Sequence, residues 1–305
     1  MRNPVQIPLI SVIVPTYERS TMLPRALDSI FSQTWPNVEV VVVDDNIPGS
    51  HWEAETAAVL EPYQARPNFK YLKTTGKTGG GAARNFAFRH CNGDYVAFLD
   101  DDDRFLPDKL EKQFQFMQEH DLDGSYHDVK WVDSNEKLVE LRTMDYTDDY
   151  STESLLRAHI LHSICPTAIY MFRRDKLLQT EGFGEVISGQ DFYLMLRCIE
   201  SGMKLRYFPG TYVVQYLHNG SRISLGTNKI NGENNLYKLK HNYFHLLTPA
   251  QRRYVRFRHY AVLSFASLRS RRPLRAAGYA FITVCSGPLI CIKEGIRYFR
   301  SKLGG

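Results

Sequence analysis

Cysteine is scarce in this 305-residue chain, and its placement excludes two common uses. The five cysteines are odd in number, widely separated and never arranged as CxxC. A disulfide framework or a zinc site would need an even set or a close spacing. We therefore expect a protein of a reducing compartment with free thiols.

Long apolar runs are also missing. A helix that spans a bilayer needs about 20 apolar residues. The charge-free stretch Ala276–Ile292 is shorter and is interrupted by Gly287-Pro288. Residues 1–8 are too polar and too rich in proline for a signal peptide. We expect a cytoplasmic protein without a spanning helix.

Acidic residues are nearly absent from the C-terminal part. After Gln251 there are twelve Lys and Arg and one acid, Glu294. The whole chain has 38 basic and 33 acidic residues, so the first 251 residues contain 26 basic and 32 acidic ones. A mildly acidic body with a basic, partly apolar tail favours peripheral contact with the cytoplasmic face of a membrane. The alternatives are helices that pack on the body with a solvated basic face, or a nucleic-acid contact, which no recognition module supports. We expect no nucleic-acid partner.

The first hundred residues alternate between apolar runs and amphipathic stretches. Strands are predicted at residues 9–14, 38–43, 69–72 and 95–99, with helices at about 23–31 and 52–60. Ser20 is the expected N-cap of the first helix, and Pro24 is tolerated in its first turn. This order predicts an α/β fold with a parallel sheet and right-handed crossovers. The carboxyl ends of the strands then share one edge.

The rest of the chain is less regular. Further elements are a helix at 107–119, a strand at 125–132, a strand at 167–172, a helix from 191 and a strand at 211–217. The polar stretch 133–150 is expected to be a surface loop. We expect a catalytic domain over residues 1–225 and a basic helical region over residues 226–305.

Four consecutive acids, Asp100 to Asp103, follow the apolar strand at 95–99. Alternation along a strand places Asp100 and Asp102 on the same side. Two carboxylates at the carboxyl end of a strand suit a hard divalent cation, Mg²⁺ or Mn²⁺. An acidic turn that caps the next helix is the alternative, and it accounts for one or two of the acids.

Three other features could carry chemistry. The glycine-rich run Thr78–Asn85 precedes a helix from about Ala82, so its free N–H groups could face a diphosphate and Arg84 could add a contact, although many such runs are simple turns. Asp191, at the start of a helix, is either a cap or a general base. His218, after a strand, is either structural or a ligand.

Six motifs in order resemble the family 2 glycosyltransferases of the GT-A fold, over residues 7–224. They are Val14–Tyr17, Val43–Asn46, Gly80–Asn85, Gly93–Asp103, Gly189–Asp191 and His218–Ser221. The resemblance implies a Rossmann-like, mostly parallel sheet flanked by helices. It also implies an inverting enzyme that moves a sugar from a nucleoside-diphosphate sugar, here a UDP-sugar, to a hydroxyl of a glycan or lipid-linked acceptor. The expected subclass is a hexosyl- or N-acetylhexosaminyltransferase.

The resemblance also assigns donor contacts. Pro15, Tyr17 and Glu18 match the loop against the nucleobase. Asp45 matches the carboxylate that binds the uracil edge, and its neighbour Asp44 is the residue most easily confused with it. Gly80 and Arg84 match positions near the donor diphosphate, and Asp101 would lie near the ribose.

The remaining matches concern the metal and the acceptor. Asp100 and Asp102 match the DxD motif, with Asp102 the direct metal ligand, and His218 matches a histidine that reaches the metal or diphosphate in some relatives. Asp191 matches the catalytic base. Relatives usually carry Glu-Asp there, whereas this chain carries Gln190-Asp191.

Three other classes of protein compete with this one. A sugar-nucleotide pyrophosphorylase would need a glycine-rich signature after the first strand, where this chain has Pro15–Arg19. An aspartate-nucleophile phosphatase would need Gly-Thr after Asp-x-Asp, where this chain has Asp103-Arg104. A catalytically weak nucleotide-sugar-binding module would lose acids, and both Asp102 and Asp191 are present.

Overall fold

The computed structural model describes residues 7–186, 188–217 and 226–292, which form two compact units. The first unit contains the described residues up to 152 together with 164–185 and 190–217. The second contains residues 153–163, the described part of 186–189, and the described residues from 226 onward.

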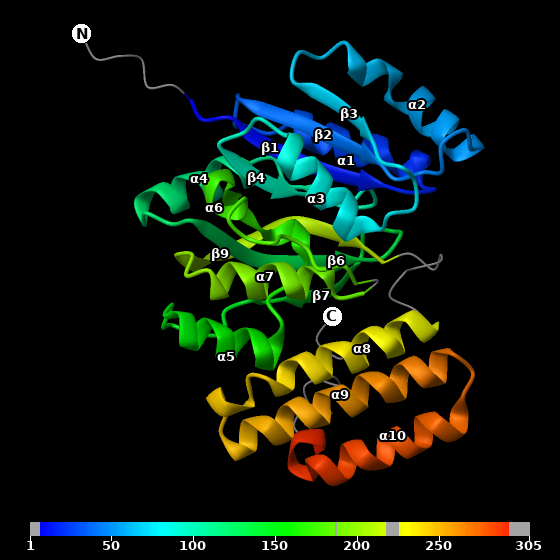
Figure 1. The fold of residues 1–305 in the computed structure, drawn as a ribbon, viewed down its shortest axis with the longest axis vertical. Helices are drawn as coiled ribbons and strands as arrows, with labels where there is room; N and C mark the ends of the chain where they lie inside the picture. Colours follow the sequence, from blue (N-terminus) through cyan, green and yellow to red (C-terminus); the bar gives the residue numbers. More distant parts are fainter. Residues whose placement is uncertain (1–6, 187, 218–225, 293–305) are drawn as a thin grey trace. The chain divides into compact units, whose positions relative to one another are not determined.

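The N-terminal half of the first unit is a parallel sheet. Its strands are β1 (Ile10–Thr16), β2 (Val38–Asp44), β3 (Phe69–Lys73) and β4 (Tyr95–Phe98), in the order β3-β2-β1-β4 (Figure 1). β1 and β2 are almost entirely buried. Both faces of a parallel sheet are covered, which explains why these strands read as continuous apolar runs.

The second half extends the same sheet in mixed directions. The order continues from β4 through β8 (Met171–Arg173), β6 (Gly124–Val132) and β9 (Leu205–Tyr216) to β5 (Arg104–Phe105). β8 is antiparallel to both β4 and β6, whereas β9 is parallel to β6 and antiparallel to β5. The expected α/β architecture is confirmed, with its parallel part at the N-terminal side.

Helices of this unit connect and cover the strands. They are α1 (Leu23–Phe31), α2 (His51–Gln64), α3 (Gly80–His90), α4 (Lys109–Glu119), α6 (Arg174–Leu177) and α7 (Gln190–Glu200). α3 packs against β1 and β2, and it also contacts α7. This contact brings the glycine-rich run and the helix of Asp191 together, although they lie about a hundred residues apart in the sequence.

The predicted cap of the first helix is wrong. Ser20 lies in a short 3-10 turn, η1 (Ser20–Met22), and α1 continues directly from it, with Met22 as its N-cap. The Ser20 hydroxyl instead donates to Glu55 at 3.1 Å. Because η1 precedes α1, no side-chain cap is needed there, and Pro24 occupies the first turn as predicted.

Two further expectations are corrected. The stretch 133–150 is not only loop, because it contains β7 (Leu138–Arg142), which pairs with β6. β7 is largely exposed, so it lacks the buried pattern of a core strand. Residues Thr167–Ile169 form a 3-10 turn, η2, before β8. The residues from Ala168 to Phe172 are all fully buried, and an apolar run does not distinguish a strand from a buried turn.

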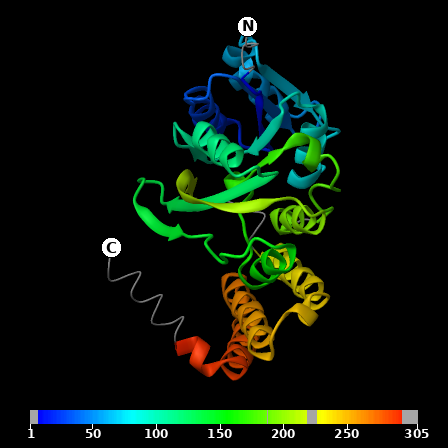
Figure 2. The ribbon, with the colours of Figure 1, turned by 90° about the vertical axis from the view of Figure 1, so that its left-hand side faces the viewer.

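The second unit is helical, as expected of the tail. It contains α5 (Thr152–His162), α8 (Gly226–His241), η3 (Phe244–Leu246), α9 (Pro249–Arg269) and α10 (Pro273–Ser286) (Figure 2). α9 begins with a capping box between Thr248 and Gln251, and it packs against both α8 and α10.

No helix in the described ranges is both long and apolar enough to cross a bilayer. All five cysteines lie within the described ranges and all are free thiols.

Candidate functional site

The ends of β1, β2 and β4 lie at one edge of the sheet. Thr16 is in register with Asp44, and Ile13 is in register with Phe98, so the residues after each strand share that edge. A hydrogen bond of 2.9 Å from the Thr16 hydroxyl to Asp101 joins the first and the fourth strand ends. Ligand sites of open α/β sheets lie at this edge.

Three of the four consecutive acids converge there. One carboxylate oxygen from each of Asp100, Asp102 and Asp103 lies within 4.8 Å of the others. Arg84 forms an ion pair with Asp100, and Arg19 forms one of 2.8 Å with Asp102. Two guanidinium groups therefore balance part of the negative charge of the stretch.

Two acids of the stretch, Asp101 and Asp103, are deeply buried. Asp101 is 4% exposed, and burial raises the pKa of its carboxyl to about 7, against the attraction of Arg19. Asp103 is 2% exposed, and burial followed by repulsion from Asp102 and Asp100 raises its pKa well above the usual range. Such crowding costs free energy unless positive charge is nearby.

The helix-cap alternative for these acids is wrong. The N-cap of α4 is Asp108, and it makes no capping hydrogen bond. Asp103 instead accepts hydrogen bonds from the Gln215 amide at 2.6 Å and from the Tyr216 backbone N–H at 3.1 Å, both in β9. Asp103 is therefore held by the far half of the sheet, and the next helix has no side-chain cap.

The donor set fits a hard divalent cation. It offers oxygens of several carboxylates in a small volume, with a surplus of negative charge, which is the chemistry that Mg²⁺ and Mn²⁺ prefer. Asp100 and Asp102 belong to the set as expected, and Asp103 joins them. His218 lies outside the described residues.

Asp45 organises the glycine-rich loop. Its carboxylate accepts hydrogen bonds from the Thr74 hydroxyl, from the Thr78 N–H and hydroxyl, and from the Gly79 N–H, at 2.5 to 2.9 Å. Gly79 has φ +93°, which favours glycine, and α3 starts at Gly80, earlier than the expected Ala82. Asp45 thus links the end of β2 to the start of α3.

Asp44 has a different environment from Asp45. It is buried, and it accepts hydrogen bonds from the Tyr71 hydroxyl at 2.5 Å and from the Asn46 N–H at 2.8 Å. These two hydrogen bonds satisfy the Asp44 carboxylate within the sheet. Of the two neighbours, Asp45 is the one that reaches the loop beyond the strand end.

The loop after β1 lies close to Asp45. A hydrogen bond with Glu18, then burial, raises the pKa of Tyr17, and the Asp45 carboxylate adds to this effect. The Glu18 N–H donates to the Asn46 side chain at 2.8 Å. Pro15 is partly exposed at the end of β1. The residues expected around a nucleobase are therefore grouped at one place.

Asp191 lies in the first turn of α7 but does not cap it, because the helix already includes Gln190. One of its carboxylate oxygens accepts the Phe192 N–H at 2.9 Å. Its charge attracts the Arg142 guanidinium, and it lies within electrostatic range of the buried Tyr170. The capping alternative is therefore not met, and the side chain is half-buried.

Two arginines of the site were missed from the sequence. Arg19 pairs with Asp101 and Asp102, and its place in the loop after β1 was a usable signal. Arg142 ends β7, its guanidinium lies 3.9 Å from the Cys165 sulfur, and it is within electrostatic range of Asp191. No local pattern points to Arg142, because only the pairing of β7 with β6 carries it there.

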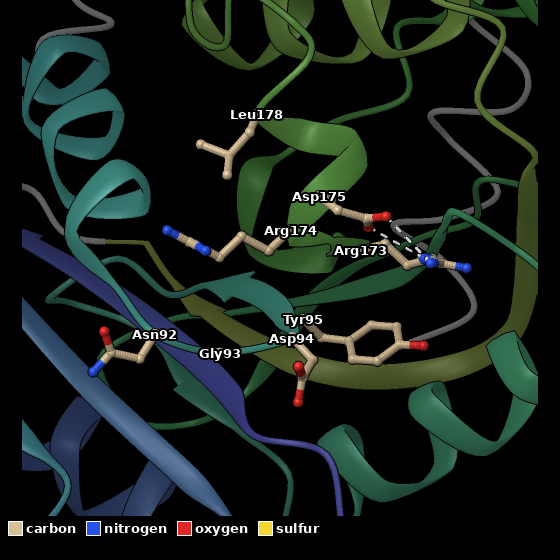
Figure 3. A pocket seen from close by; sticks show the side chains of 8 residues that line it. All are labelled: Asn92, Gly93, Asp94, Tyr95, Arg173, Arg174, Asp175 and Leu178. Carbon is tan, nitrogen blue, oxygen red and sulfur yellow. Dashed lines mark hydrogen bonds and ion pairs between the residues drawn. The ribbon is translucent and has the colours of Figure 1, made fainter.

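A pocket of about 410 Å³ lies at the opposite end of β4 (Figure 3). It is lined by the turn before β4, including Asp94, and by residues around α6 such as Arg174 and Leu178. Arg173 points away from Arg174 and pairs with Asp175 at 3.2 Å. The two acids that line this pocket, Asp94 and Asp175, do not converge on one another, so the pocket is not the candidate site.

Known proteins are similar to this chain in sequence and in fold. The glycosyl transferase family 2 sequence profile matches residues 11–178, and that of glycosyl transferase family group 2 matches residues 95–280. An uncharacterized glycosyltransferase of Haemophilus influenzae is 27% identical over 247 residues, which is 80% of each chain.

Two solved structures illustrate the fold. S. aureus TarS 1-349 in complex with UDP-GlcNAc has a TM-score of 0.59 and 22% identity, over 90% of this chain and 72% of that chain. The mannosyltransferase PcManGT from Pyrobaculum calidifontis, in complex with GDP-Man and Mn²⁺, has a TM-score of 0.60 and 18% identity, over 97% and 84%. The expected GT-A fold is confirmed. Since each of the two profiles matches more than half of the chain, this protein belongs to glycosyl transferase family 2.

Proposed function

We propose that this glycosyltransferase is an inverting enzyme that transfers a hexose or N-acetylhexosamine from a nucleoside-diphosphate sugar, preferably a UDP-sugar, to a hydroxyl of a glycan or lipid-linked acceptor. The observation that carries the proposal is the convergence of Asp100, Asp102 and Asp103 beside Arg84 and the start of α3. Carboxylates for a cation stand next to N–H groups and a guanidinium for an anion, which is what a metal-bound diphosphate needs.

The acids at the end of β4 would hold Mn²⁺ or Mg²⁺. Asp102 is the proposed direct ligand, with Asp100 and His218 as further ligands. A bound cation would stabilise the negative charge that develops on the departing diphosphate. Arg84 and the N-terminus of α3 would hold the diphosphate itself, with Gly80 allowing its close approach.

The donor nucleoside is assigned to the loops around β1 and β2. Pro15, Tyr17 and Glu18 would lie against the base, and Asp101 would approach the ribose. Asp45 is the proposed partner of the uracil edge. Since its oxygens already accept bonds from Thr74, Thr78 and Gly79, it would share them with the base.

Asp191 is the proposed general base. It would take the proton from the acceptor hydroxyl while that oxygen forms a bond to sugar C1 and the bond from C1 to the diphosphate oxygen breaks. One in-line displacement inverts the anomeric centre, and the proton ends on the Asp191 carboxylate.

Two relatives in fold support the donor class. TarS 1-349 was solved with UDP-GlcNAc, and PcManGT was solved with GDP-Man and Mn²⁺. To test the proposal, the purified chain is incubated with a panel of UDP- and GDP-sugars and Mn²⁺ or Mg²⁺, and release of the nucleoside diphosphate is measured. We expect metal-dependent release from at least one sugar nucleotide. Absence of release from the whole panel, with and without glycan and lipid-linked acceptors, would contradict the proposal.

We also propose that residues 1–225 form the catalytic domain and that residues 226–305 form a basic tail. This tail would bind the cytoplasmic face of a membrane. Ala276 and Thr283 of α10 are buried, whereas Leu274 is 89% exposed and Phe281 is 71% exposed. Four arginines surround the α9–α10 turn, namely Arg269, Arg271, Arg272 and Arg275. Apolar side chains flanked by basic ones suit an anionic bilayer, where each basic residue contributes about 1 kcal/mol.

Flotation with vesicles tests the membrane proposal. Full-length protein is mixed with vesicles of phosphatidylcholine with or without phosphatidylserine. Binding should require the anionic lipid and weaken in the variant with Leu274→Glu and Phe281→Glu. Leu138→Glu is the matched control, because Leu138 is an exposed apolar residue of β7. Equal flotation of all three proteins, or none at low salt, would contradict membrane contact through α10.

A further inference from the structure

Trp131 lies near the end of β6, at the edge of the sheet that carries the acids. β8 is antiparallel to both β4 and β6, so β6 runs in the same direction as β4, and β9 is parallel to β6. Trp131 and Gln215 are the penultimate residues of β6 and β9. Their side chains therefore stand beside the end of β4, where the acids follow.

A row of side chains crosses the sheet at this level. Trp131 is in register with Gln215 of β9 on one side and with Glu140 of β7 on the other. Asp103 directly precedes β5 and continues the β5–β9 register, which places it opposite Gln215. Side chains that are directly opposed on neighbouring strands share one face of a sheet. Asp103, Gln215, Trp131 and Glu140 thus form one row, which we call the Trp131 row.

Hydrogen bonds connect the row to the cluster of acids. The Trp131 indole N–H donates to Oε1 of Gln215 at 2.8 Å, and the Gln215 amide donates to Asp103 at 2.6 Å. Asp103 is one of the three acids whose oxygens converge. Since neighbouring strands lie about 4.8 Å apart, Trp131 lies about 10 Å from Asp103, two strands away. The indole is therefore held at a fixed place beside the proposed metal site.

The row leaves an aromatic face and a carboxylate available. Trp131 is partly exposed and Glu140 is exposed. Within the described residues, the indole stacks on no other aromatic ring and on no cation, and the Glu140 carboxylate has no hydrogen bond or ion pair. The single polar atom of the indole is already bonded to Gln215, so what remains of the ring for a ligand is apolar surface.

This combination suits a neutral sugar ring. The C–H groups of one face of a hexopyranose are apolar and can pack on an indole, while its hydroxyls at the rim can donate to a carboxylate or an amide oxygen. A phosphate group suits the row poorly, because Glu140 and Asp103 would repel it. The chemistry of the row therefore favours the acceptor sugar over the diphosphate of the donor.

We propose that Trp131 forms a binding subsite for a neutral hexopyranose of the acceptor, stacked on the indole with a hydroxyl bonded to Glu140. The subsite lies on the row that leads from the proposed metal site to β7. This inference rests on the proposed function. It predicts that Trp131 sets the KM for the acceptor and has little influence on the KM for the donor.

Transfer from a UDP- or GDP-sugar to methyl glycosides of glucose, galactose, mannose and N-acetylglucosamine tests the proposal. Trp131→Leu keeps an apolar side chain without the ring, and it should raise the KM for the accepted glycoside by about five- to tenfold, the scale of one aromatic contact. The KM for the sugar nucleotide should change by less than about twofold.

Trp35→Leu is the matched control for the loss of an indole. Trp35 is also partly exposed, and its N–H donates to the Pro8 carbonyl at 3.1 Å, before the start of β1. Both KM values should stay unchanged in this variant. Within β7, Glu140→Ala should raise the glycoside KM about threefold, the scale of one hydrogen bond, whereas Leu141→Ala, at the neighbouring position on the other face, should not.

Tryptophan fluorescence gives a second readout. The chain has three tryptophans, Trp35, Trp52 and Trp131. Addition of the accepted glycoside to the protein with UDP and Mn²⁺ should change the emission, and the change should vanish in Trp131→Phe and persist in Trp35→Phe. Because Trp131→Phe keeps an aromatic face, its glycoside KM should stay within about threefold of that of the unaltered chain.

Several results would overturn the subsite. They are an unchanged glycoside KM in Trp131→Leu, an equal rise of both KM values, a fluorescence change that persists in Trp131→Phe, and nucleoside-diphosphate release without transfer to any glycoside of the panel. Thermal unfolding shows whether Trp131→Leu is folded, and if it is not, the fluorescence of Trp131→Phe decides. Absence of nucleoside-diphosphate release from every sugar nucleotide would instead contradict the proposed function itself.

Discussion

The two ends of strand β4 carry similar side chains in different surroundings. Before the strand, Asp94 is exposed and accepts the Leu9 N–H at 2.9 Å, and Arg173 pairs with Asp175 at the surface. After the strand, Asp101 and Asp103 are buried and the oxygens of Asp100, Asp102 and Asp103 converge. Both ends of β4 have carboxylates and guanidinium groups, but only at the carboxyl end do several carboxylates lie close together.

The two ends of β4 differ in how deeply the acids are buried and in whether their carboxylates converge. Exposed acids at the start of β4 are solvated and paired one by one, so their charges cost little. The acids after β4 are removed from water and repel one another, which raises the pKa values of Asp101 and Asp103. A fold retains such an arrangement only if positive charge compensates it, here from Arg19 and Arg84 and, as proposed, from a cation and its ligand.

The largest effect is expected at the proposed base. Asp191→Asn keeps the shape of the side chain but cannot accept the proton, so sugar transfer should fall by about 10²-fold or more. Binding of the nucleoside diphosphate should change little, because Asp191 acts on the acceptor. Initial rates of transfer and calorimetric nucleotide affinity are the two measurements. Turnover at the original rate would show that Asp191 has no role as a base.

A smaller effect is expected from neutralising a metal ligand, and the two ends of β4 supply the matched pair. Asp102→Asn should weaken Mn²⁺-dependent UDP binding by at least about tenfold, or about 1.4 kcal/mol. Asp94→Asn makes the same chemical change at the other end and should leave binding unchanged. Calorimetry with and without Mn²⁺ measures both. Equal affinities for the two variants would remove Asp102 from the proposed metal site.

The contrast between burial and exposure also applies inside the sheet. His127 of β6 is fully buried, and burial, followed by repulsion from Lys109, lowers its pKa to about 3. The unfolded chain has a histidine pKa of about 6.5, so the stability due to the neutral ring is complete above that value and is lost as the pH falls toward 3. The free energy of unfolding should fall by up to about 1.4 kcal/mol per pH unit in this window from this group alone.

Urea unfolding between pH 7 and pH 4 measures this effect. The variant His127→Asn has no titrating ring, and its amide can still donate to the Asp128 carbonyl, which lies 2.7 Å from Nδ1 of the histidine. Its stability should therefore depend less steeply on pH than that of the unaltered chain. Parallel pH profiles for the two proteins would show that His127 is not responsible.

The smallest effect is expected at the pocket before β4. Arg173→Ala removes the ion pair with Asp175, in which both side chains are substantially exposed. Exposed pairs contribute about 0–1 kcal/mol, so the free energy of unfolding should change within that range and UDP affinity should not change. Thermal unfolding and calorimetry check both. A marked loss of nucleotide affinity would show that the two ends of β4 are coupled.

Much of the parallel half of the fold follows from local sequence. Valine-rich runs predict β1 and β2, and the acids and glycines after the strands predict which edge carries the site, because parallel strands with helical crossovers present their carboxyl ends together. Asp100, Asp102 and the glycine-rich run could be found in this way since they adjoin those strands.

Tertiary structure decided what depends on pairing between distant segments. Asp103 is held by Gln215 and Tyr216 across the sheet. Arg142 comes within electrostatic range of Asp191 only because β7 pairs with β6, and Gln190 lies near Gly80-Gly81 only because α3 meets α7. No periodicity encodes such contacts, because each joins residues about 110 positions apart or depends on an exposed edge strand without a burial pattern. The sequence by itself thus determined the kinds of groups present at the site, and the tertiary structure decided which of them meet.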